Sequence, residues 1–96
     1  MDTMIIRGSA GPDVLYELRN HRFIVGKKQL RKALLRGGVD RVYLALDADP
    51  AVTGPLADLA QQTGTEIDWV DKMTDLGRAC GIDVGAAAAA TLAAQD

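Results

Sequence analysis

The order of apolar and polar positions divides the chain into short strands and helices. Apolar stretches with the residue types and lengths of β-strands cover residues 23–25 and 41–46, and residues 66–70 alternate polar and apolar as a strand with one wetter face does. Apolar residues recur at helical spacing in residues 12–19, 26–37, 53–64 and 71–80. Asp49 and Pro50 also form a helix-start signal. Because Gly54 and Pro55 follow closely, we expect the regular part of that helix to begin only near Thr53.

Two stretches decide the fold class. Residues 41–46, which read RVYLAL, are apolar enough for a central strand that is buried on both faces. Residues 87–92 are mostly alanine, and helix propensity alone predicts a helix there. The alternating order of strands and helices instead predicts a further strand over these residues, and we follow that order. The sequence therefore predicts an α/β sandwich.

Length and composition restrict the possible functions. Ninety-six residues suit a single domain, 1–96, in which Met1 to Gly11 have no periodicity and form a flexible extension or a short edge strand. The one cysteine, Cys80, cannot form an internal disulfide, and no metal-ligand spacing is present. We therefore expect no cofactor and a reducing, cytoplasmic setting. No signal peptide or membrane-spanning stretch is evident, so we expect no membrane partner.

Charge is distributed unevenly along the chain. The formal net charge is −2, which argues against indiscriminate binding of nucleic acid. Residues 19–41 nevertheless hold eight of the 11 lysines and arginines and only one of the 13 acidic residues. A basic patch on an acidic body indicates one defined surface for a polyanion. Chance clustering on a surface helix is the alternative interpretation.

The predicted helix within residues 26–37, GKKQLRKALLRG, begins unusually. Lys27 and Lys28 lie in its first turn, and no Ser, Thr, Asp or Asn caps it. A helix N-terminus carries partial positive charge and unpaired N–H groups, so two lysines there oppose local stability. Cations together with free N–H donors form a site that an anion completes. The alternative is a solvated polar face.

Two further features have simpler explanations than catalysis, and a third concerns the direction of two apolar side chains. Asp47 and Asp49 follow a predicted strand, where carboxylates usually cap helices. His21 has no evident serine or cysteine partner. Ile82 and Val84 lie between glycines in a predicted loop, where they either project outward or seal the edge of the sheet. We therefore expect a protein that is not an enzyme.

Three motifs in order carry a resemblance to a known family. GKKQLRKALLRG, ALDADP and LGRACGIDVGAAAAA resemble those of the ribosomal protein L7Ae family, and most of all its small bacterial kink-turn-binding branch. The similarity covers Phe23 to Leu92. It implies a three-layer α/β/α sandwich with a small mixed sheet. It also implies binding of the kink-turn, a sharply bent RNA duplex with sheared G·A pairs beside a short bulge.

The resemblance also implies a set of RNA contacts. They fall on Gly26, Lys27, Lys28, Gln29, Lys32, Arg36, Asp49, Ile82, Asp83 and Val84. In the family, the two residues at the positions of Lys28 and Gln29 read guanine edges. The cations at the positions of Lys32 and Arg36 bind phosphates, and Lys27 should add to that positive surface. The loop that holds Ile82 and Val84 covers unstacked bases. Lys28 and Gln29 stand where archaeal relatives have Asn-Glu, and Met73 stands where many relatives have lysine.

The expected partner is therefore kink-turn RNA, in the ribosome or in another structured RNA, and we expect a monomer. A second class of function stays open, namely a protein-interaction module of the same fold without a specific RNA partner. Binding to kink-turn RNA, compared with a mutant RNA that lacks the G·A pairs, distinguishes the two.

Overall fold

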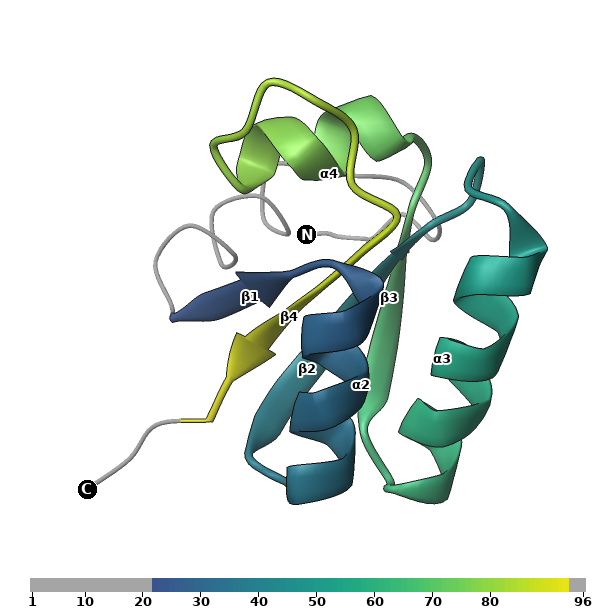
Figure 1. Ribbon diagram of the computed structural model, residues 1–96, viewed down its shortest axis with the longest axis vertical. Coiled ribbons are helices and arrows are strands. Elements are labelled where there is room, and N and C mark those ends of the chain that lie inside the picture. The colour runs from purple at the N-terminus through teal and green to yellow at the C-terminus, as the bar shows by residue number, and fades with distance from the viewer. Residues whose placement is uncertain (1–21, 94–96) are drawn as a thin grey trace, which may run out of the picture.

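A four-stranded mixed sheet in the order β1-β4-β2-β3 forms the framework of the protein (Figure 1). The computed structural model describes residues 22–93. Its elements in chain order are β1 (Phe23–Val25), α2 (Lys27–Arg36), β2 (Val39–Ala45), α3 (Pro50–Gln62), β3 (Glu66–Val70), α4 (Met73–Ala79) and β4 (Ala88–Leu92). The helix expected over residues 12–19, the segment Met1 to Gly11, and His21 lie outside the described residues.

Strand β2 is central, as its apolar sequence predicts. It pairs in parallel with β3 and antiparallel with β4, which in turn pairs antiparallel with β1. Val42 to Ala45 are buried. The predicted end of this strand is wrong by one residue, because Leu46 lies beyond it with 53% of its surface exposed.

Side chains of β2 and β4 alternate between two apolar layers. Val42 and Leu44 pack with Leu30 of α2 and Leu56 of α3 on one face of the sheet. Tyr43, between them in the sequence, packs with residues of α4 on the other face. Helices α2 and α3 lie side by side, apart from α4 (Figure 1). The described residues therefore form the three-layer α/β/α sandwich, which confirms the expected fold.

The alanine-rich segment is a strand because of where it packs. Ala88, Ala89 and Ala90 are fully buried in β4, between β1 and β2. Small side chains on both faces let helices approach the sheet closely from either side. Tertiary packing thus overrides the helix propensity of alanine, as helix propensity is a weak local preference.

Helix α3 begins earlier than its sequence predicts. It starts at Pro50, not near Thr53, because the Asp49 side chain caps it: Oδ1 accepts a hydrogen bond of 2.9 Å from the N–H of Ala51. Pro55 lies inside the helix and cannot donate to the carbonyl of Ala51. Ala51 is exposed, so water can satisfy that carbonyl. The Gly54-Pro55 pair is therefore tolerated within a continuous helix.

Candidate functional site

The three motifs meet at one end of the sheet. Strands β1, β2 and β3 end there and β4 begins there. Backbone hydrogen bonds join the segments: Gly26 N–H donates to Ala88 O at 3.0 Å, and Ala45 N–H donates to Ala87 O at 2.9 Å. Leu46 N–H donates to Val70 O at 2.7 Å. This end of the sheet therefore brings together the start of α2, the turn before α3 and the loop before β4.

The start of α2, formed by Gly26, Lys27, Lys28 and Gln29, is here called the α2 tip. Gly26 has φ 105°, a conformation that glycine adopts readily, and the space where a Cβ would stand is open. No side chain caps the helix, and its first turn holds no acidic residue. Lys27, Lys28 and Gln29 are exposed, and neither lysine has an ion pair with another described residue. The tip is thus open to an external anion.

The outer side of α2 continues this positive surface. Leu30 and Leu34 face the core, whereas Lys32 and Arg36 are exposed. Arg36, Lys32 and Arg22 also line a hollow of about 210 Å³ beside the end of α2. Among residues 22–93, no acidic residue lines this hollow.

Arg41 departs from the charge pattern of the sequence. It belongs to the basic segment, but on β2 its guanidinium forms ion pairs with Glu66 at 3.0 Å and Asp68 at 3.2 Å. Both carboxylates come from β3, which lies next to β2 in parallel register. Arg41 is therefore neutralised within the sheet and does not add to the positive surface of α2.

Asp47 and Asp49 serve as helix caps, as the sequence indicates. Asp47 Oδ1 accepts a hydrogen bond of 2.8 Å from Met73 N–H at the start of α4, and Asp49 caps α3. Within residues 22–93 no group of three or more His, Cys, Asp or Glu residues could hold a metal ion. Burial raises the pKa of the Cys80 thiol from 9.0 to about 11, so this cysteine is protonated at neutral pH and lacks the character of a nucleophile.

Residues 81–85, here called the apolar loop, present their side chains outward. Val84 is 70% exposed, Ile82 is 38% exposed, and Asp83 is also exposed. The alternative that Ile82 and Val84 seal the sheet edge is therefore wrong for Val84 and holds at most in part for Ile82. Backbone hydrogen bonds hold the loop against α4: Ile82 N–H donates to Gly77 O and Ala86 N–H donates to Met73 O, each at 3.0 Å.

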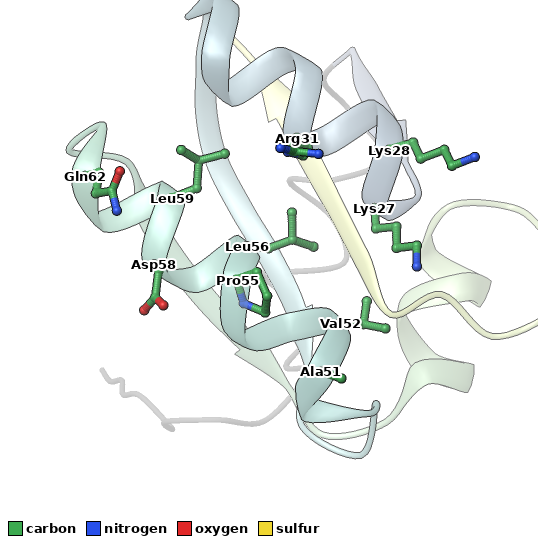
Figure 2. A pocket seen from close by; sticks show the side chains of 10 residues that line it. All are labelled: Lys27, Lys28, Arg31, Ala51, Val52, Pro55, Leu56, Asp58, Leu59 and Gln62. Atoms are coloured by element: carbon green, nitrogen blue, oxygen red, sulfur yellow. The ribbon is translucent and has the colours of Figure 1, made fainter.

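Sequence reasoning missed a groove between α2 and α3 (Figure 2). Its lining residues are Lys27, Lys28, Arg31, Ala51, Val52, Pro55, Leu56, Asp58, Leu59 and Gln62. The four-residue spacing of Lys27 and Arg31 hinted at a second basic row on α2. The opposing wall comes from α3, so only the packing of the two helices reveals the groove.

No helix among the described residues is long and apolar enough to cross a membrane.

A model of the ribosomal protein L7Ae/L30e/S12e/Gadd45 family matches residues 13–96. A protein of Bacillus pumilus named "RNA-binding protein" is 52% identical over 69 residues, which cover 72% of this chain and 84% of that protein. "Large ribosomal subunit protein eL8" of Halobacterium salinarum is 40% identical over 72 residues, covering 74% of this chain and 60% of that protein.

Among solved structures, the Giardia lamblia 15.5kD RNA binding protein shares the fold. It superposes with a TM-score of 0.81 at 22% identity, over 91% of this chain and 80% of that chain. The names of these relatives describe RNA-binding and ribosomal proteins and not enzymes. This agrees with the expectation from the sequence that the protein is not an enzyme.

Proposed function

The chain belongs to the ribosomal protein L7Ae/L30e/S12e/Gadd45 family, and on this premise we propose that it binds and stabilises kink-turn RNA. We further propose that it acts as a monomer in the cytoplasm, on ribosomal RNA or another structured RNA. The names of the bacterial and archaeal relatives support RNA as the partner. The feature that carries the proposal is the open, cationic α2 tip beside the apolar loop.

The α2 tip suits the G·A pairs of a kink-turn. Lys28 donates to guanine O6 and N7, and Gln29 both donates and accepts hydrogen bonds. Gly26 has no side chain, and open space in front of it lets an RNA strand approach the backbone. The unpaired N–H groups of the first turn complete a site for a phosphate or a guanine edge.

The cations of α2 suit the RNA backbone. Lys27, Lys32 and Arg36 are exposed, and none has an ion pair within the described residues, so phosphates can neutralise them. A sharp bend brings phosphates of two duplex arms close together, which increases their repulsion. A compact cationic surface therefore stabilises the bent form more than a straight duplex.

The apolar loop suits the bulge of the kink-turn. Unstacked bases expose apolar faces, which Ile82 and Val84 can cover. Asp83 lies between them and borders the RNA in this proposal. Asp49 caps α3 through Oδ1 and is exposed, and we assign it a place near an unstacked base of the bulge. Met73 supplies no cation at this end of the sheet, where many relatives have a lysine.

The test is a binding assay against a kink-turn RNA and a matched RNA in which the sheared G·A pairs are replaced by Watson–Crick pairs. We expect a large preference for the kink-turn. Lys28→Ala should reduce that preference, whereas Lys32→Ala should weaken binding of both RNAs and lower the salt dependence. Equal affinity of the unaltered protein for the two RNAs would reject the proposal and favour a protein-interaction module.

A further inference from the structure

The groove between α2 and α3 is a second concave surface that begins at the α2 tip. Its volume is about 570 Å³, within the range of sites that hold small ligands. Lys27 and Lys28 line the groove and also form part of the tip. The tip and the groove therefore share these two lysines, and Arg31 adds a further positive charge along the α2 side of the groove (Figure 2).

The two walls of the groove differ in chemistry. The α2 wall presents Lys27 and Arg31, one helical turn apart. The α3 wall presents Val52, Leu56 and Leu59, at the spacing of one helix face, together with the ring of Pro55. Leu56 is buried at the floor, and Val52 and Leu59 are half-buried. An occupant that matches both walls has a flat apolar part and an anionic part.

Charge in the groove is not balanced by the protein. Lys27, Lys28 and Arg31 have no ion pair with another described residue. Asp58 is the one carboxylate among the described residues that line the groove, and its side chain points away from α2 (Figure 2). The cationic wall of α2 therefore favours an anionic occupant. The apolar wall of α3 favours an occupant that also has an apolar part.

We propose that this groove holds one unstacked nucleotide of the RNA that binds at the α2 tip. Its base packs on Val52, Pro55 and Leu59, and its phosphate lies against Lys27 and Arg31. The inference rests on the proposed function. A volume of about 570 Å³ admits a single nucleotide and not a duplex, and a nucleotide combines an apolar face with a negative charge. An acidic peptide is the alternative occupant, but continuity with the tip favours a strand of the same RNA.

The test is a coupling experiment between protein and RNA. In a kink-turn RNA with single-stranded ends, each unpaired nucleotide is replaced in turn by an abasic one, and Kd is measured for the unaltered protein and for Leu59→Ala. A second variant, Pro55→Ala, changes an exposed groove residue and removes a helix-breaking ring, so folding is not threatened. Arg22→Ala is the control, because Arg22 lies outside the groove.

Besides the bulge positions that the apolar loop covers, we expect one further abasic position to weaken binding of the unaltered protein by about fivefold, at the low end for a base packed on a protein side chain. The same abasic position should weaken binding by a smaller factor in Leu59→Ala and Pro55→Ala. In Arg22→Ala it should weaken binding by the same factor as in the unaltered protein. If every abasic position acts equally in all four proteins while the kink-turn preference persists, the groove assignment is wrong and the proposed function stands. If the unaltered protein shows no kink-turn preference, both fail.

The alternative occupant has its own measurement. The same four proteins and Arg31→Ala are titrated with a glutamate-rich peptide. If the peptide binds the unaltered protein, if Arg31→Ala abolishes that binding, and if no abasic position couples to the groove variants, the groove holds an acidic protein segment. That result would overturn the proposal that it holds a nucleotide.

Discussion

Gly77 is the residue at which α4 comes closest to the apolar loop. A Cβ built on Gly77 would stand 2.1 Å from the carbonyl oxygen of Val84 and 3.1 Å from the Cα of Gly85. Both atoms belong to backbone, which cannot rotate away as a side chain can. The glycine therefore sets the height of the loop above the helix, and with it the position of the exposed Val84 side chain.

Gly77→Ala should lower the free energy of unfolding by about 2 kcal/mol or more, because the loop must shift to admit the methyl group. Gly54→Ala is the matched control, since Gly54 is also helical and a Cβ there meets nothing within 4 Å. That control should raise stability by about 0.5–1 kcal/mol through lower chain entropy in the unfolded state. Urea unfolding measures both, and equal effects of the two substitutions would refute the close contact.

Helix α2 combines weak local stability with an open site. Its tip lacks a side-chain cap, and its first turn carries two lysines where a helix favours acidic residues. Packing of Leu30 and Leu34 holds the helix in place despite this start. We interpret these unfavourable charges as a feature that serves RNA binding. A substitution at Lys27 that raises the stability of the free protein should therefore lower its affinity for RNA.

Lys27→Glu should raise the melting temperature of the free protein, because an acid in the first turn contributes about 0.3–1 kcal/mol. The same substitution should weaken RNA binding. Lys32→Glu serves as the control: it removes a proposed phosphate contact but lies in mid-helix, where the dipole effect is small, so it should weaken binding without the gain in stability. Thermal unfolding and RNA titration of both variants measure this, and a loss of stability in Lys27→Glu would contradict the interpretation.

At the scale of elements, the sequence predicts what local pattern determines. The spacing of Leu30 and Leu34 identifies α2, and the alternating order of elements correctly makes a strand of the alanines in β4. The predicted start of α3 is too late, because the local cap at Asp49 outweighs the disruptive effect of Pro55. The neutralisation of Arg41 depends on the parallel register of β2 and β3, which no local pattern encodes.

The candidate site shows the same division. The α2 tip could be predicted, because missing caps and adjacent lysines are visible in the sequence. The apolar loop could be predicted in position, but the outward direction of Val84 depends on the contact with Gly77. The groove needs two helices side by side, so residues of α3 gave no signal of their part in it.

For the whole molecule, segregation of charge matters more than its sum. The net charge of −2 repels nucleic acid in general, while α2 presents its cations on one surface. Long-range repulsion and local attraction together favour an RNA that fits the surface over one that only carries charge. Specificity for shape should therefore accompany a moderate dependence on salt.

Affinity for a kink-turn RNA should fall with salt at a slope of roughly −3 on a double-logarithmic plot, since the four cations assigned to phosphates, Lys27, Arg31, Lys32 and Arg36, each release slightly less than one counterion. Titrations at several KCl concentrations give this slope. Lys32→Ala should make it shallower by about one. A slope near zero would mean that α2 does not neutralise phosphates.

The most direct test of the account is NMR of the backbone amides during titration with kink-turn RNA. We predict that the amide signals of Lys27, Lys28 and Gln29 shift most, together with those of the apolar loop, and that amides in the middle of α4 shift little. RNA that binds tightly while these three amides keep their free-state positions would contradict the claim that the open tip of α2 is the site.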